Sequence, residues 1–166
     1  MKRLLLVRHA KSSWKTAAGD FERPLNERGV MDAPLMGVRL QHFAAPADLI
    51  VTSPARRARM TAELLAAALH YDAAAIVEAE EIYQAGLEDL QGVVRRLDDA
   101  FSTVLLVGHN PGITNFANWL CGAGIDSMPT AAAAVVELAV ESWCEAGRNK
   151  GSLVDFDYPK RRAAGP

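Results

Sequence analysis

The chain has 166 residues, half of them apolar, and a formal net charge of −2, which is typical of one ordinary globular domain with a core of its own. A net charge this small gives no general attraction to nucleic acid or to an anionic membrane, so neither is an expected partner, and any affinity for anions must come from a local cluster of cations. The two cysteines define no disulfide framework, and the N-terminal apolar run is too short for a signal-peptide core, so we expect a cytoplasmic protein.

The first elements in the chain are a strand and a helix. The continuous apolar run at residues 4–7 predicts a strand covered on both faces, and a polar loop follows it. Pro34 limits the regular part of the next helix, which is expected either to start near Asp32 or to bend there. The predicted apolar face of this helix has helical spacing and consists of Met31, Leu35 and Val38.

A second strand and helix come next. Residues 49–51 form another short apolar run, which predicts the second buried strand. Ser53 and Pro54 directly after it are typical of a helix start, with Ser53 as the N-cap and Pro54 at the first helical position. The apolar positions expected on this helix are Met60, Leu64 and Ala68.

The second half of the chain continues the alternation. Residues 76–77 are a short strand candidate, and residues 104–107 are the clearest buried strand after the first. A helix is predicted before residues 104–107 and another after it, the second ending at Gly122. The apolar positions of these two helices are, in order, Leu87, Leu90, Val94, Leu97, Phe116, Trp119 and Leu120.

The end of the chain predicts a β-hairpin. Residues 134–140 and 153–158 are strand candidates on either side of a glycine-bounded turn, and they fit best at the edge of the sheet. Alternating strands and helices predict an α/β fold, a three-layer α/β/α sandwich with a mostly parallel central sheet and an antiparallel C-terminal edge hairpin. We expect a single domain over residues 1–160, followed by a flexible tail at residues 161–166.

Cationic and imidazole side chains follow three of the predicted strands. Arg8 and His9 follow the first strand, Arg57 lies at the start of the helix after the second, and His109 follows residues 104–107. Because ligands of such folds bind beyond the carboxyl ends of the strands, we expect these side chains to share one site. Guanidinium groups match the oxygens of a phosphoryl group, and a neutral imidazole is a competent nucleophile toward phosphorus. No metal is expected, since the arginines would repel a cation.

Four ordered motifs resemble the histidine phosphatase superfamily, most closely its short branch of SixA-type phosphohistidine phosphatases. They are Leu-Val-Arg-His-Ala-Lys at 6–11, Arg-Pro-Leu-Asn-Glu-Arg-Gly at 23–29, Ser-Pro-Ala-Arg-Arg-Ala at 53–58 with Thr61, and Val-Gly-His-Asn-Pro at 107–111. The resemblance implies a phosphoglycerate mutase-like fold and a metal-independent hydrolase that needs no cofactor.

The resemblance also implies roles for individual residues. His9 resembles the nucleophile that becomes phosphorylated, Arg8 the adjacent phosphate ligand, and His109 the second catalytic histidine. The spacing of four residues after Ser53 selects Arg57 over its neighbour Arg56 as the phosphate-binding arginine. Further expected contacts to phosphate or substrate are Arg23 and Asn110, and the candidates for a proton donor are Glu80 and Glu81.

The sequence offers no evident strong general acid, since Glu80 and Glu81 have the character of surface carboxylates, and this favours one substrate class. Larger members of the superfamily supply a carboxylic acid that protonates the leaving oxygen of an ester, whereas an imidazole leaves a phosphoramidate more easily. We therefore expect hydrolysis of phosphohistidine on a protein, with inorganic phosphate as product. Two alternatives stay open: hydrolysis of a small phosphate ester with Glu80 or Glu81 as the acid, and a non-catalytic module that binds phosphorylated partners.

Overall fold

A six-stranded sheet forms the centre of the molecule in this computed structural model, which describes residues 1–44 and 46–161. The strands are β1 (Lys2–Arg8), β2 (Leu49–Thr52), β3 (Val77–Glu78), β4 (Thr103–Gly108), β5 (Ala133–Leu138) and β6 (Gly151–Asp157). They lie in the order β3-β2-β4-β1-β5-β6, and the first four of that order are parallel. β5 runs antiparallel to β1, and β6 runs antiparallel to β5 at the edge, as the sequence predicts.

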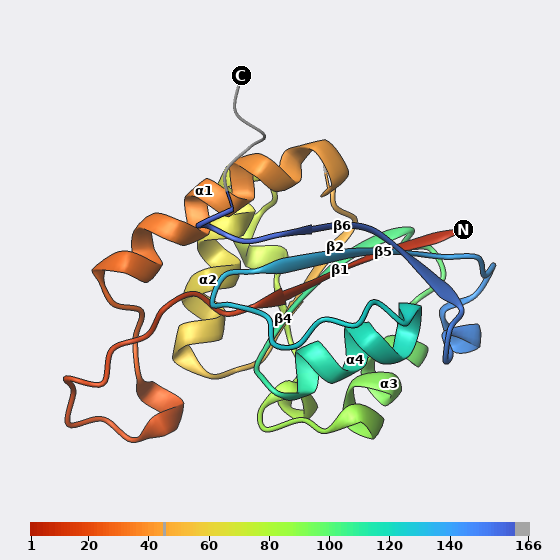
Figure 1. Cartoon of the computed structure of the whole chain (residues 1–166). Coiled ribbons are helices and arrows are strands. Elements are labelled where there is room, and N and C mark those ends of the chain that lie inside the picture. Colours follow the sequence, from red (N-terminus) through yellow and green to blue (C-terminus); the bar gives the residue numbers. More distant parts are fainter. Residues whose placement is uncertain (45, 162–166) are drawn as a thin grey trace.

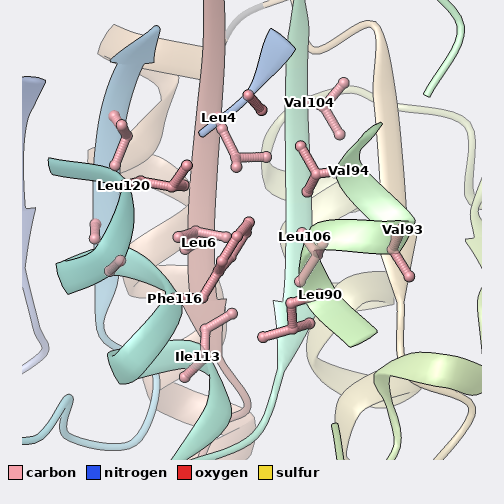
Figure 2. Close-up of a cluster of buried hydrophobic side chains, with 14 of the residues drawn as sticks. Leu4, Leu6, Leu90, Val93, Val94, Val104, Leu106, Ile113, Phe116 and Leu120 are labelled. Atoms are coloured by element: carbon pink, nitrogen blue, oxygen red, sulfur yellow. The ribbon is translucent and has the colours of Figure 1, made fainter. Parts of the chain in front are cut away.

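Helices cover both faces of the sheet (Figure 1). They are α1 (Glu27–Ala44), α2 (Arg56–Ala68), α3 (Leu87–Arg95) and α4 (Gly112–Cys121). Alternate side chains of β1 enter two separate cores: Leu5 and Val7 pack with α1 and α2, while Leu4 and Leu6 pack with α3 and α4. Figure 2 shows the second core, where Phe116 of α4 lies over the sheet beside leucines of β1 and β4. The predicted three-layer α/β sandwich is confirmed.

Short 3-10 turns complete the connections, and some predicted boundaries shift by a few residues. The turns span Asp20–Glu22, Ala73–Ala75, Glu80–Ile82 and Trp143–Glu145. The first strand of the hairpin ends at Leu138 rather than at residue 140, and the second begins at Gly151 rather than at residue 153. Helix α4 ends as predicted, with Gly122 in the left-handed conformation that glycine adopts without steric cost.

For helix α1, the alternative of a start near Asp32 is wrong, because the helix continues through Pro34, and the predicted apolar face is also wrong. The helix begins at Glu27, because the Asn26 side chain accepts a hydrogen bond from the Gly29 N–H at 2.9 Å and so caps it. The expected apolar face of Met31, Leu35 and Val38 is exposed to solvent, with Met31 72% exposed. The face of α1 that contains small residues packs against α2 instead. A Cβ on Gly37 would lie 2.5 Å from the Ala68 Cβ of α2, so the two helices approach closely only because residue 37 is a glycine. The remaining buried positions of α1 include Ala33, Met36 and Leu40.

Helix α2 begins two residues later than predicted, at Arg56. The Ser53 hydroxyl does accept a hydrogen bond from the Ala55 N–H at 3.2 Å, but it closes a turn that precedes the helix. The fully buried residues of the helix include Ala58, Ala62 and Leu65, whereas two of the predicted positions, Met60 and Leu64, are half-buried at the margin of the same core.

Two further observations concern the predictions for membranes and for the tail. Within the described residues, none of the helices combines the length and the apolar character that crossing a bilayer requires.

The predicted flexible tail at residues 161–166 lies outside the described residues except for Arg161.

Candidate active site

The register of the three central strands brings both histidines to one edge of the sheet. Arg8 at the end of β1 pairs with Gly108 at the end of β4, so His9 and His109 emerge side by side. The His9 N–H donates to the Gly108 carbonyl at 3.0 Å, and the Ser53 N–H donates to the Val107 carbonyl at 3.0 Å. The ends of β1, β4 and β2 therefore meet at the position where ligands of parallel sheets bind.

His9 is held with one ring nitrogen free for chemistry. Its Nδ1 lies 2.7 Å from the Ala10 carbonyl oxygen, which can only accept a hydrogen bond, so Nδ1 carries the proton. The side chain is 7% exposed, and burial, together with His109, Arg57 and Arg8, lowers the His9 pKa to about 3. The ring is thus neutral at ordinary pH, and Nε2 keeps the lone pair that a nucleophile needs.

His109 lies beside His9, with 5.1 Å between the ring centroids. Its Nε2 forms a hydrogen bond of 2.7 Å with the Ser53 hydroxyl, which fixes the direction of the ring. Burial and the charge of Arg57 lower the His109 pKa to about 4, against an opposing effect of Asp20. The other ring nitrogen, Nδ1, is buried and has no hydrogen-bond partner among the described residues.

Thr61 of α2 ties Arg57 to the segment that carries His9. The Thr61 hydroxyl donates to the Arg57 carbonyl at 2.7 Å and accepts from the Ala10 N–H at 3.0 Å, and the side chain is fully buried. This single hydroxyl links the first turn of the helix to Ala10, the residue after His9. The pattern Ser-x-x-x-Arg-x-x-x-Thr at residues 53–61 thereby sets the distance between Arg57 and His9.

Arg8 and Asn110 meet at one backbone carbonyl. The Met128 carbonyl accepts from Arg8 Nη1 and from Asn110 Nδ2, both at 2.9 Å. The Asn110 side chain also donates to Ser127 and accepts from the Thr114 hydroxyl. The Asn110 side chain thus orients the segment around Met128, whose carbonyl also accepts from Arg8. Both N–H groups of its side-chain amide are engaged, so none is free for the phosphate contact that we predicted.

Asp20 is a carboxylate of the site that sequence reasoning missed. Its Oδ2 lies 3.1 Å from Arg57 Nη2 and accepts from the Tyr83 hydroxyl at 2.7 Å, while its Oδ1 lies 3.2 Å from both Nε and Nη2 of Arg23. The hydrogen bond from Tyr83 and the charges of the arginines lower the Asp20 pKa to about 2. The spacing of three residues between Asp20 and Arg23, which one 3-10 turn brings together, is a signal that could have found it.

Arg23 joins the site from the loop after β1. The Trp14 ring stacks on its guanidinium, with 3.5 Å from the ring centroid to Cζ, and the Ser12 hydroxyl accepts from its Nη1 at 2.7 Å. Behind this loop, Gly29 allows α1 to approach closely, since a Cβ there would lie 2.2 Å from the Lys11 carbonyl oxygen. The Arg-Pro-Leu-Asn-Glu-Arg-Gly motif therefore both supplies a cation and anchors the segment that presents it.

A cleft of about 230 Å³ lies between these side chains. The residues predicted for phosphate binding or reaction all line it, and they are Arg8, His9, Arg23, Arg57, His109 and Asn110. The two candidate proton donors do not, because Glu80 and Glu81 line a separate depression, where Glu81 forms an ion pair of 3.3 Å with Arg96. The structure thus unites the cationic residues and leaves out the predicted acids.

Comparisons with known proteins show which proteins this chain resembles. The model of the histidine phosphatase superfamily (branch 1) matches residues 4–93. An uncharacterized protein of Mycobacterium tuberculosis is 32% identical over 164 residues, which cover 93% of this chain and 100% of that protein.

Two solved structures share the whole fold. The candidate phosphohistidine phosphatase SixA from Nakamurella multipartitia is 26% identical with a TM-score of 0.83, and the match covers 96% of this chain and 97% of that one. The corresponding protein from Agrobacterium tumefaciens is 28% identical with a TM-score of 0.78, over 95% and 98% of the two chains. The phosphoglycerate mutase-like fold implied by the motifs is confirmed.

Proposed function

The chain belongs to branch 1 of the histidine phosphatase superfamily, and on that premise we propose that it hydrolyses phosphohistidine on a protein partner through a covalent intermediate at His9. The proposal depends on the cleft and on the groups that face it.

Three buried nitrogen atoms without a partner carry the proposal. They are Arg8 Nε, Arg57 Nε and His109 Nδ1, each on a residue that lines the cleft. Among the described residues, one other buried side-chain atom, Arg3 Nε, is in this state. All three are N–H groups when His109 Nε2 accepts its hydrogen bond from the Ser53 hydroxyl, which leaves the ring proton on Nδ1. A buried N–H without an acceptor costs about 1–3 kcal/mol, so this concentration is unfavourable unless an acceptor binds there. A phosphoryl group has three oxygens to offer, which matches the number of nitrogen atoms.

The reaction proceeds in two displacements. His9 Nε2 attacks the phosphorus of the substrate, the new P–N bond forms, and the bond to the substrate imidazole breaks with its electron pair staying on that nitrogen. The departing imidazole takes its proton from water. A water molecule then attacks the phosphorus on His9, the electron pair returns to Nε2, and inorganic phosphate leaves. Arg8 and Arg57 neutralise the negative charge of the transferring group in both steps, and the neutral His109 ring donates a hydrogen bond to one of its oxygens.

The state of the carboxylates favours a P–N bond over a P–O bond. Asp20 is the carboxylate that contacts the arginines of the cleft, and with a pKa of about 2 it has no proton to give at neutral pH. Glu80 and Glu81 line another depression. An alkoxide leaving group needs an acid, whereas an imidazole leaves without a strong one, so the site suits phosphohistidine better than an ester.

The dimensions of the cleft support a protein substrate. Its volume of about 230 Å³ is below the range of about 300–1,000 Å³ that is usual for pockets enclosing a small molecule. A phosphorylated side chain can enter such a cleft while the rest of its protein stays outside. The names of the two similar SixA structures agree with this substrate class.

A comparison of turnover numbers tests the proposal. The purified protein and the His9→Ala variant are each given a phosphohistidine protein and a panel of small phosphate esters, and release of phosphate is measured. We expect turnover of the phosphohistidine protein by the wild type alone. Preference for esters, lost in the Glu81→Gln or Glu80→Gln variant, would establish the esterase alternative instead. Tight phosphate binding without release of phosphate from any donor would establish the non-catalytic binding module.

A further inference from the structure

Asp20 holds the two arginine side chains on one wall of the cleft with a single side chain. It forms ion pairs of 3.1 Å with Arg57 and 3.2 Å with Arg23, and its backbone carbonyl also accepts from Arg57 Nη1 at 2.7 Å. The arginine side chains are 7% and 8% exposed, whereas that of Asp20 is 47% exposed. The carboxylate therefore reaches from the surface to two nearly buried cations.

The contacts of Asp20 determine which edge of Arg57 stays available. Both terminal nitrogens, Nη1 and Nη2, donate to Asp20, one to its carbonyl and one to its carboxylate. The remaining edge of the guanidinium carries Nε, which is buried without a partner among the described residues. An arginine binds a phosphoryl group best through two parallel N–H groups of one edge, and here the edge that contains Nε is left for that purpose.

Arg23 is fixed in the same manner. Its Nε and Nη2 both lie 3.2 Å from Asp20 Oδ1, while Nη1 donates to the Ser12 hydroxyl at 2.7 Å. Long cationic side chains lose considerable rotamer freedom when they are held in one geometry, and that loss opposes binding if the ligand itself must impose the order. Because Asp20 already holds both arginine side chains in one geometry, the substrate does not have to supply this loss of conformational entropy when it binds.

From these contacts we propose that Asp20 is a positioning residue, which orients Arg57 so that its free edge with Nε faces the transferring phosphoryl group and holds the Arg23 guanidinium beside it. The inference rests on the proposed function, because it assigns Asp20 to the same phosphate site. Tyr83 supports the arrangement: its hydroxyl donates to Asp20 at 2.7 Å, and its ring contacts Phe21 edge-on at 5.1 Å between centroids, so it contacts two residues of the turn.

The Asp20→Asn variant, with Glu22→Gln as its matched control, tests this role. Glu22 is an exposed carboxylate of the same 3-10 turn and forms no ion pair with another described residue, so its loss removes equal charge without touching the arginines. Affinity for inorganic phosphate is measured by calorimetry, and kcat/KM is measured on a phosphohistidine protein. Misplaced catalytic groups commonly cost about tenfold to a hundredfold in rate, and we expect a loss of that size in kcat/KM for Asp20→Asn, with about tenfold weaker phosphate binding. The control should match the wild type.

A second background separates positioning from a general structural effect. If Asp20 acts through the fork of Arg57, its substitution should change phosphate affinity much less in an Arg57→Lys protein than in the wild type, because the fork is already gone. Equal losses in both backgrounds, or a lowered melting temperature that accounts for the loss, would overturn the inference. So would wild-type phosphate affinity and turnover in Asp20→Asn. A wild-type protein that neither binds phosphate nor hydrolyses phosphohistidine would instead overturn the proposed function itself, and this inference with it.

Discussion

The buried, neutral state of His9 predicts a specific dependence of stability on pH. Folding lowers the His9 pKa from 6.5 to about 3, so between these values the folded protein binds fewer protons at this site than the unfolded chain. Its contribution to stability is complete above pH 6.5 and is lost progressively as the pH falls toward 3. Between pH 7 and pH 5 this linkage lowers the free energy of unfolding by about 2 kcal/mol.

Urea denaturation of the wild type and of a His9→Asn variant, each at pH 7 and pH 5, measures this contribution. The variant has no imidazole at the site, so the same change in pH should reduce its free energy of unfolding by about 2 kcal/mol less than in the wild type. Exposed His70 provides the control, since it adopts a left-handed backbone conformation that asparagine tolerates, and His70→Asn should behave like the wild type. Equal pH dependence of the wild type and His9→Asn would refute the conclusion that His9 is a buried, neutral imidazole in the folded protein.

Three substitutions test the framework around His9. Thr61→Val removes a buried hydroxyl with two hydrogen bonds and should lower the free energy of unfolding, measured by urea denaturation, by about 2–4 kcal/mol. Thr61→Ser keeps the hydroxyl and should cost much less. Equal losses in the two variants would contradict the stabilising role of these hydrogen bonds. Arg57→Lys keeps the charge but loses the two parallel N–H groups of the guanidinium, and it should lower kcat/KM by about a hundredfold. The same substitution at exposed Arg56 should leave kcat/KM unchanged. A larger loss in Arg56→Lys than in Arg57→Lys would contradict the choice of Arg57 as the phosphate-binding arginine. Gly29→Ala places a Cβ 2.2 Å from a backbone carbonyl oxygen and should lower the melting temperature by several degrees, while Gly19→Ala, which meets open space, should not; tolerance of both would refute the close approach.

The strands and the sheet edge were predictable because they depend on local apolar runs. Residues 4–7 and 104–107 are long enough to identify two buried neighbours, and polar residues directly after each run indicate the site. The sequence alone therefore predicts that His9 and His109 each follow a buried strand. Parallel pairing aligns the carboxyl ends of these strands and so brings the two histidines together.

The orientation of α1 was not predictable from apolar spacing. Met31, Leu35 and Val38 form the more hydrophobic stripe, yet the close approach of α1 to α2 requires small residues such as Gly37. Shape rather than hydropathy selects the buried face there, and shape depends on a partner far away in the sequence.

The spacing of Asp20 and Arg23 was readable from the sequence, but the contact of Asp20 with Arg57 and the positions of Glu80 and Glu81 were not. Asp20 contacts Arg57 across 37 positions, and an exposed acidic residue in a loop gives no local sign of such a contact. Glu80 and Glu81 had a suitable chemical type, but the 3-10 turn that contains them buries Ile82, and the residue after the turn, Tyr83, is the one that contacts Asp20. Which residue of a short turn faces a site depends on the packing of the turn, and residue type alone does not determine it.

Capture of the phosphorylated enzyme tests the central claim most directly. The protein is mixed with a radiolabelled phosphohistidine protein, quenched in alkali within milliseconds, and digested, and the labelled peptide is identified by mass spectrometry. We predict an acid-labile phosphoryl group on His9, formed and lost at rates compatible with turnover and absent from the His9→Ala protein. Label on another residue, or turnover by His9→Ala at the wild-type rate, would contradict the account.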